Sequence, residues 1–150
     1  RIREDIPLLD IKSFTLDLFK SRFERHNIQL RHTNGFAQGS IYGFRSTFYP
    51  VFVNIIDNAI YWLKQSDNND KIIRLHADES GIYISNNGPC VQPQDKERIF
   101  ELRFSRKPSG RGLGLSVSRE VLEAEDYHLF LDSPRKDSTV TFKISKNSHE

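Results

Sequence analysis

The sequence is poor in the features that mark secreted, membrane-spanning or nucleic-acid-binding proteins. It contains one cysteine among 150 residues, so no internal disulfide can form, which suits a reducing compartment. No run approaches the ~18 apolar residues that a membrane span needs, and no signal peptide is visible. The net charge of +2 is too small to favour nucleic acid as a partner. We therefore expect a cytoplasmic domain that makes no membrane contact itself, although its parent protein could be membrane-anchored.

Methionine is absent altogether, and the sequence begins at Arg1. We take these two features as signs of a fragment excised from a longer protein. With 37% hydrophobic residues, a chain of this length can bury one sizeable core. We find no repeat, low-complexity tract or internal linker, so residues 1–150 are expected to form one domain.

Hydrophobic periodicity predicts three main helices and a set of short strands. Helices are expected at residues 8–25, 48–63 and 113–125, with a shorter one at residues 95–102. The apolar face of the first helix would consist of Leu9, Phe14, Leu16, Leu18, Phe19 and Phe23. Residues 35–39 read as a loop, and strands are expected at 27–32, 40–44, 71–77, 81–85, 127–131 and 139–145. The fold class is then α/β (α+β), a two-layer sandwich with one mixed sheet and its helices on a single face.

Two asparagines, Asn54 and Asn58, lie four residues apart in the helix expected at 48–63. That helix accepts Pro50 because proline is tolerated in a first turn. Residues at this spacing share one face, about 6 Å apart along the axis. Their amide oxygens can reach one small hydrated cation, and magnesium suits this geometry. On their own, the two are better interpreted as helix-surface residues with no ligand, although asparagine is a poor interior helix residue.

Three glycines, Gly110, Gly112 and Gly114, stand at the start of the helix expected from residue 113. Glycine lets the backbone approach a ligand closely, and a helix start presents unpaired amides with a partial positive charge, which is an anion site. Basic side chains suited to a polyphosphate accompany them: Arg106, Lys107 and Arg111. The alternative is a flexible, solvated loop, and the motif is neither a Walker loop nor a dinucleotide fingerprint.

A further motif, residues 86–89 (NNGP), ends the strand expected at 81–85 and would alone indicate only a turn. Taken in order, the motifs resemble those of the catalytic ATP-binding domain of histidine kinases. That domain has the Bergerat-type ATP-binding fold, in a superfamily that also holds gyrase B, the mismatch-repair MutL protein and a heat-shock chaperone. Four segments resemble the family's asparagine, first glycine, phenylalanine and second glycine motifs: 52–60 (FVNIIDNAI), 84–90 (ISNNGPC), 99–107 (IFELRFSRK) and 110–115 (GRGLGL).

This resemblance implies that the chain binds ATP and Mg²⁺, with a lid at about residues 87–111. Asn58 would bind the magnesium ion, and Asn54, one turn earlier, would assist. Three residues would line the adenine end: Asn86, Gly88 and Thr139, the last of them on the final strand. The other expected nucleotide contacts are Tyr61, Arg106, Lys107, Gly110, Arg111, Gly112, Leu113, Gly114 and Leu115.

Three positions depart from the family's pattern. Asn86 stands where the family usually has an aspartate that accepts a hydrogen bond from the adenine amino group. Its amide oxygen can still accept that bond, but without the charge we expect adenine affinity to fall by about tenfold. Cys90 replaces a usual glycine, and Tyr61 replaces a lysine that helps to bind phosphate. These departures leave a degenerate pocket open as an interpretation.

Asn54 also bears on the reaction. In the gyrase and MutL branches the residue at this position is a glutamate that activates water, whereas an amide is no general base. We therefore expect a transferase, a histidine kinase that moves the γ-phosphate of ATP to a histidine on a separate dimerisation domain, upstream or in trans. From there the phosphate would pass to a response regulator in two-component signalling. The alternatives are a self-contained ATPase acting as a conformational switch and a non-catalytic nucleotide-binding or interaction module.

Overall fold

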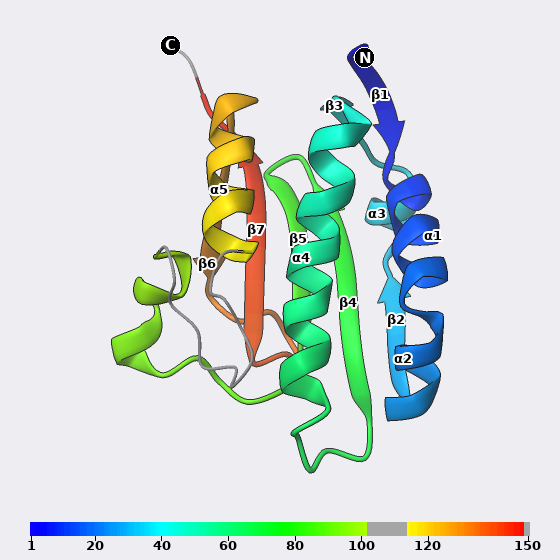
Figure 1. Cartoon of the computed structure of the whole chain (residues 1–150), viewed down its shortest axis with the longest axis vertical. Coiled ribbons are helices and arrows are strands. Elements are labelled where there is room, and N and C mark those ends of the chain that lie inside the picture. Colours follow the sequence, from blue (N-terminus) through cyan, green and yellow to red (C-terminus); the bar gives the residue numbers. More distant parts are fainter. Residues whose placement is uncertain (102–113, 149–150) are drawn as a thin grey trace.

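The computed structural model describes residues 1–101 and 114–148 and has a five-stranded sheet at its centre (Figure 1). Its strands are β2 (Ile28–His32), β4 (Lys71–Asp78), β5 (Gly81–Asn86), β6 (Tyr127–Asp132) and β7 (Val140–Lys146). They lie in the order β2-β4-β5-β7-β6. The β2–β4 pair is parallel and the other pairs are antiparallel, so the predicted mixed sheet is confirmed.

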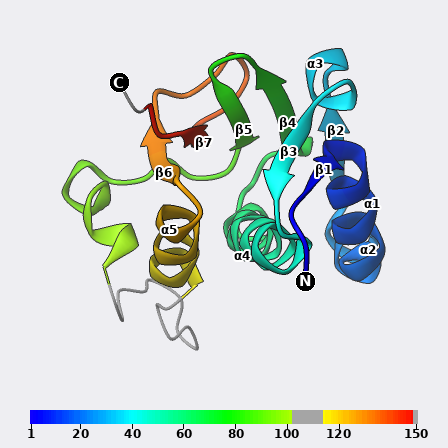
Figure 2. The ribbon, with the colours of Figure 1, turned by 90° about the horizontal axis from the view of Figure 1, so that it is seen from above.

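Long helices cover one face of this sheet, as predicted (Figure 2). They are α1 (Leu8–Leu18), α2 (Lys20–His26), α4 (Arg45–Leu63) and α5 (Gly114–Ala124). Within the described part of the chain, no helix is long and apolar enough to cross a membrane.

A second, two-stranded sheet pairs β1 (Glu4–Pro7) with β3 (Ser40–Gly43) in antiparallel register. The strand β3 was predicted from the sequence, whereas β1 was not. Only one residue of β1, Ile6, is buried, so this short strand leaves no alternating pattern to detect. Its pairing with β3 places the N-terminal residues beside the start of α4.

The helix predicted at residues 8–25 is two helices separated by Phe19, which has φ −101° and ψ 9°. Helical hydrogen bonds continue across the break, because the amide of Phe19 donates to Thr15 O and that of Phe23 to Phe19 O. The predicted apolar face was partly wrong. The side of α1 that packs on the core carries Leu8, Ile11 and Thr15, and four residues of the predicted face are exposed: Leu9, Phe14, Leu16 and Leu18.

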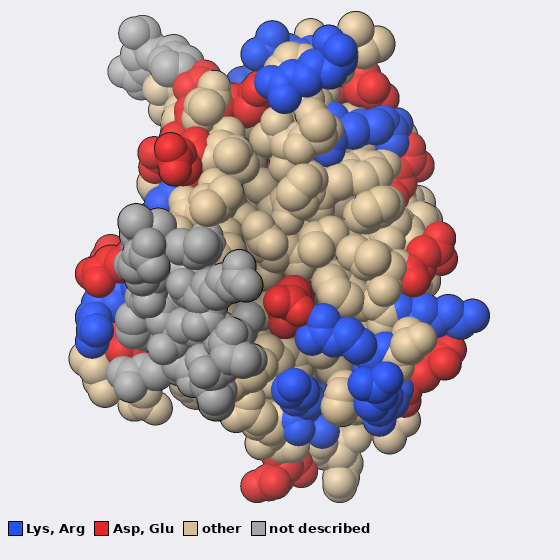
Figure 3. Space-filling model, viewed as in Figure 1, with Lys and Arg blue, Asp and Glu red and all other residues tan. Residues whose placement is uncertain are grey.

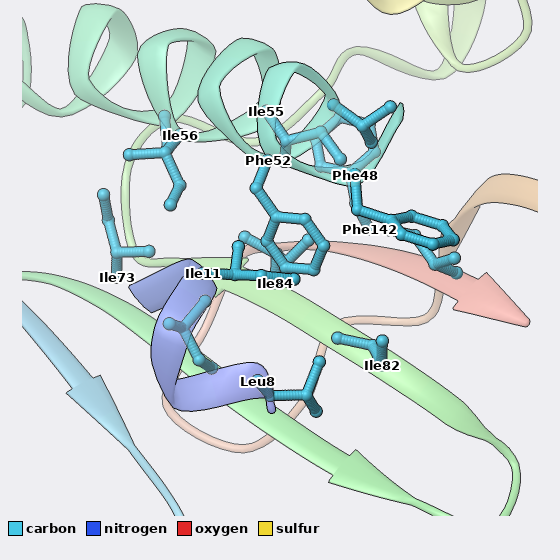
Figure 4. Close-up of a cluster of buried hydrophobic side chains, with 14 of the residues drawn as sticks. Leu8, Ile11, Phe48, Phe52, Ile55, Ile56, Ile73, Ile82, Ile84 and Phe142 are labelled. Carbon is cyan, nitrogen blue, oxygen red and sulfur yellow. The ribbon is translucent and has the colours of Figure 1, made fainter. Parts of the chain in front are cut away.

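The helix α4 supplies most of the core and begins three residues earlier than predicted. Pro50 is therefore in its second turn and not its first, and this helix contains one fewer backbone hydrogen bond because proline lacks an N–H. The buried face of α4 packs onto the sheet and α1 (Figure 4). Burying each such side chain contributes about 1.5–3 kcal/mol. The side chains drawn in this cluster include Leu8, Ile11, Phe48, Phe52, Ile55, Ile56, Ile73, Ile82, Ile84 and Phe142.

Two further segments differ from the sequence predictions. The loop expected at residues 35–39 contains a short helix, α3 (Asn34–Ala37), whose start is capped by the Thr33 hydroxyl accepting from Phe36 N at 3.3 Å. The helix expected at residues 95–102 is instead two 3-10 turns, η1 (Pro93–Asp95) and η2 (Arg98–Phe100), while residue 102 lies outside the described part. Neither segment has the length from which a helical period can be recognised.

Candidate functional site

The two predicted magnesium ligands lie one turn apart on the half-buried edge of α4. Asn54 and Asn58 both flank the buried face formed by residues such as Ile55 and Ala59. The helix therefore holds the two amides on one side, as the four-residue spacing predicted. Their role as magnesium ligands remains a prediction.

Asn54 also has a structural role that sequence analysis missed. Its Nδ2 donates hydrogen bonds to Ser118 Oγ at 3.0 Å and to Gly114 O at 3.3 Å, which connects α4 to the N-terminal half of α5. Ser118 is only 1% exposed. A cation at Asn54 would therefore be bound through Oδ1, since Nδ2 carries protons and faces α5. The same contact places the start of α5, a favourable position for phosphate, next to this asparagine.

The three residues predicted at the adenine end are brought together by hydrogen bonds. Asn86 ends β5, and its Oδ1 accepts from Gly88 N at 2.9 Å. Its backbone carbonyl accepts from Thr139 N at 2.8 Å and from Thr139 Oγ1 at 3.2 Å. The same hydroxyl also donates to the Gly88 carbonyl. The prediction of Thr139 on the final strand was wrong by one residue, because β7 begins at Val140.

Gly88 connects this cluster to the C-terminal end of α4. A Cβ built at residue 88 would lie 3.1 Å from Asn86 Oδ1 and 3.5 Å from Leu63 Cδ2. The residue thus fits between the Asn86 amide and the last turn of α4. Because Asn58 lies on the same helix, about one and a half turns before Leu63, α4 connects the predicted base residues to the predicted magnesium residues.

Tyr61, where relatives of the kinase type were expected to carry a lysine, is packed among aromatic and basic side chains. Its ring meets that of Trp62 edge-on, with 5.0 Å between centroids and an interplanar angle of 87°. Lys64 Nζ lies 5.2 Å from the centroid of the Tyr61 ring. Lys64 therefore places a cation beside Tyr61, and the role of Tyr61 in binding phosphate remains a prediction.

A group of basic residues surrounds His26 near the C-terminal end of α4. Burial lowers the pKa of His26, and neighbouring positive charges lower it further. Figure 3 shows Lys and Arg side chains gathered over this part of the helix face. Sequence analysis missed the group because its members are far apart in the chain; they are Lys64, Arg25, Lys71 and Arg22. Arg22 of this group also forms an ion pair with Asp57, with 2.6 Å between Nη1 and Oδ1.

Asn87, the second asparagine of the NNGP motif, has a structural role. Its Oδ1 accepts from Ile72 N at 3.0 Å, and its Nδ2 donates to Asp70 O at 2.7 Å. Asn68 Nδ2 in turn donates to Asn87 O at 2.6 Å. These bonds hold the turn before β4 against the end of β5. The motif alone does not show that Asn87 stabilises this turn, whereas Asn86 lies at the predicted base end.

Several predicted contacts lie outside the described residues. They are Arg106, Lys107, Gly110, Arg111, Gly112 and Leu113, together with the part of the predicted lid after residue 101. Two predicted contacts of the second glycine motif are described. Gly114 is the exposed first residue of α5, whereas Leu115 is partly buried and packs against the core.

The donors that α4 offers to a magnesium ion are the side-chain amides of Asn54 and Asn58. Within residues 1–101 and 114–148, no group of three or more His, Cys, Asp or Glu side chains gathers as a ready-made metal site. The amide oxygens of Asn54 and Asn58 fit magnesium only if nucleotide phosphates and water complete its coordination. That is the usual way in which this ion is held beside a nucleotide.

The mixed sheet, its helical layer and this asparagine-lined edge define an ATP-binding α/β domain. The chain belongs to the family described as "Histidine kinase-, DNA gyrase B-, and HSP90-like ATPase", which matches residues 43–148. This membership confirms the resemblance stated from the sequence motifs.

Sensor kinases are among the relatives with similar sequences. Identity is 24% over 146 residues with the adaptive-response sensory kinase SasA of Synechocystis sp., covering 93% of this chain and 38% of SasA. It is 29% over 125 residues with the sensor histidine kinase ZraS of Salmonella typhimurium, covering 80% and 26% respectively. It is 26% over 153 residues with the sensor histidine kinase WalK of Bacillus subtilis, covering 95% and 24%. The chain thus spans well under half of the length of these relatives.

Solved structures of histidine kinases share the fold. The catalytic domain of ThkA superimposes with a TM-score of 0.77 at 24% identity, covering 98% of this chain and 96% of that one. The mycobacterial sensor histidine kinase MprB gives a TM-score of 0.71 at 22% identity, covering 99% and 100%. These likenesses confirm the predicted fold class.

Proposed function

We propose that this chain is the catalytic domain of a sensor histidine kinase, which binds Mg²⁺ and ATP and directs the γ-phosphate to a histidine on a separate dimerisation domain. That domain would lie upstream or act in trans, and a response regulator would receive the phosphate afterwards. Similarity to three sensor kinases over most of this chain supports the proposal.

The observation that carries the proposal is the environment of Asn54. An ATPase that hydrolyses its nucleotide needs a base beside the magnesium residue, one helical turn from Asn58. Here that position holds an amide whose nitrogen is bonded to Gly114 O and Ser118 Oγ. An amide neither accepts a proton at neutral pH nor activates water, so transfer to a positioned acceptor is favoured over hydrolysis.

Different residues of the described part of the chain would then bind different parts of the nucleotide. Asn58 and the Oδ1 of Asn54 would hold magnesium, which would neutralise phosphate charge. The start of α5 would attract the phosphates. Thr139 and Asn86 would position the base at the other end. Catalysis would come mainly from positioning and electrostatic stabilisation of the transferred phosphoryl group.

Isothermal titration with a non-hydrolysable ATP analogue, with and without Mg²⁺, tests the binding step. We expect magnesium-dependent binding that Asn58→Ala abolishes, while Asn147→Ala, a change on the surface beyond β7, leaves it unchanged. Nucleotide affinity that is the same with and without Mg²⁺ would contradict the role proposed for Asn58. For the reaction, the full-length protein given γ-labelled ATP should acquire an acid-labile phosphoryl group on a histidine. Steady release of inorganic phosphate without such labelling would instead support the self-contained ATPase.

One observation favours a second candidate, a degenerate module that has lost catalysis. The Oδ1 of Asn86, which was expected to accept from adenine, already accepts from Gly88 N. Absence of binding when this titration is repeated with several purine nucleoside triphosphates would establish this candidate in place of the kinase.

A further inference from the structure

The two polar side-chain atoms of Asn86 are in different situations. The residue is only 4% exposed, and its Oδ1 accepts from Gly88 N at 2.9 Å. Among the residues that the structure describes, its Nδ2 makes no hydrogen bond. This nitrogen is not fully buried, so it is an unpaired donor that a ligand beside Asn86 can reach.

Physical chemistry fixes the orientation of this amide. The backbone N–H of Gly88 can only donate, so the Asn86 atom that faces it must be the oxygen. Rotating the amide by 180° would set two donors against each other. The Nδ2 of Asn86 therefore points away from Gly88. Because Asn86 follows Ile82 and Ile84 at alternate positions of β5, its side chain lies on the face of the sheet covered by helices.

We propose that Asn86 makes this site selective for nucleoside triphosphates with a 6-oxopurine base, hypoxanthine or guanine, over adenine. The inference rests on the proposed function, because it requires a base to lie against Asn86, Gly88 and Thr139. A 6-oxopurine presents a carbonyl acceptor at position 6, which matches the Nδ2 donor. Adenine presents an amino donor there, which opposes it.

An aspartate at residue 86 would reverse this preference. One carboxylate oxygen would still accept from Gly88 N, and the second would present an acceptor where Nδ2 now presents a donor. That acceptor suits the amino group of adenine and repels the carbonyl of a 6-oxopurine. Asn86→Asp is therefore a specificity switch that keeps both the shape of the side chain and its bond to Gly88.

Isothermal titration in the presence of Mg²⁺ tests the proposal with three ligands that differ at purine position 6. They are ITP with a carbonyl, purine riboside triphosphate with hydrogen, and ATP with an amino group. We expect affinity to decrease in that order, with ITP binding about tenfold more tightly than ATP. In Asn86→Asp the order should invert, while Asn147→Asp, which adds the same charge away from the site, should keep the original order.

The outcomes separate this inference from the proposed function. Wild-type protein that prefers ATP, or binds all three ligands equally, would overturn the selectivity and leave the kinase proposal standing. Wild-type protein that binds none of them would overturn both. The ranking of ligands by the wild-type protein is sufficient by itself, so the proposal remains falsifiable even if the Asn86→Asp variant fails to fold.

Discussion

The guanidinium carbon of Arg119 lies 3.7 Å from the centre of the Phe100 ring, while Arg119 Nε donates to Leu129 O at 3.1 Å. Phe100 in turn meets Phe142 edge-on, with 6.1 Å between ring centroids. One side chain of α5 thus joins η2 to β6 and, through Phe100, to the core strand β7. This arrangement fixes the end of η2 beside α5.

Replacing Arg119 should loosen this junction. We expect Arg119→Leu to lower the free energy of unfolding by about 1–3 kcal/mol, since it removes both a cation–π contact and a hydrogen bond. Arg119→Lys keeps the charge and should cost less. Urea denaturation followed by circular dichroism measures both. Arg25→Leu, an exposed arginine on α2, is the control, and an equal loss in that variant would show that the junction contributes nothing specific.

Alanine variants of the two asparagines of α4 should differ in their effects on stability and on nucleotide binding. Asn54→Ala loses the bonds to Gly114 and Ser118, so we expect its free energy of unfolding to fall by about 1–2 kcal/mol along with nucleotide affinity. Asn58→Ala should lose magnesium-dependent binding with a much smaller change in stability. Thermal unfolding without nucleotide, compared with titration, distinguishes the two effects. Equal destabilisation by both variants would contradict this division.

The Thr139 hydroxyl should be necessary for the geometry of the base end. Thr139→Val keeps the shape and the backbone bond to Asn86 O but removes the hydroxyl that donates to the Asn86 and Gly88 carbonyls. We expect a loss of about 0.5–1.5 kcal/mol in stability together with weaker nucleotide binding. Thr139→Ser restores the hydroxyl and should recover most of the binding. A valine variant that binds as well as the wild type would show that the hydroxyl is dispensable.

Acid should destabilise the domain through His76. Burial lowers the pKa of His76 below its ordinary 6.5, and Arg135 lowers it further, although Asp78 opposes them. The unfolded chain then binds a proton at His76 more readily than the folded chain does. The contribution of neutral His76 to the free energy of unfolding is therefore fully present at pH values above the ordinary pKa. This contribution is lost as the pH falls through the lowered pKa of His76 in the folded protein.

Melting temperatures from about pH 8 to about pH 5 measure this effect, and we expect them to decline below about pH 6.5. The decline should be shallower in His76→Gln, which cannot be protonated. The remaining slope would reflect other groups, including His26, whose pKa is also lowered. An unchanged slope in the variant would exclude His76 as a contributor.

Local periodicity was sufficient to predict the elements that carry the site, but it did not predict their contacts. The helix α4 and strand β5 were predicted because their apolar residues repeat with a clear period, and the order of motifs then indicated the family. The hydrogen bonds of Asn54 to α5 span 60 and 64 residues. No sequence pattern reports a pairing that depends on how two helices pack.

The errors have physical causes of the same kind. The four exposed apolar residues of α1 were assigned to the core because a hydrophobic pattern does not say which neighbours are present to cover it. The contact of the Asn86 oxygen with adenine remains a prediction, and the motif, which shows residue type alone, did not reveal that this oxygen also contacts Gly88. Only the position of Gly88 N reveals that the oxygen already has a donor.

The bond between Asn86 and Thr139 also has a consequence for how the protein folds. It connects residues 53 positions apart, at the end of the central strand β5 and just before the last strand β7. The base end of the site therefore does not exist until the last strand of the chain has paired with β5. Contacts between distant segments form late, because the chain must first close a long loop. The appearance of nucleotide binding during refolding would accordingly mark the completion of the sheet.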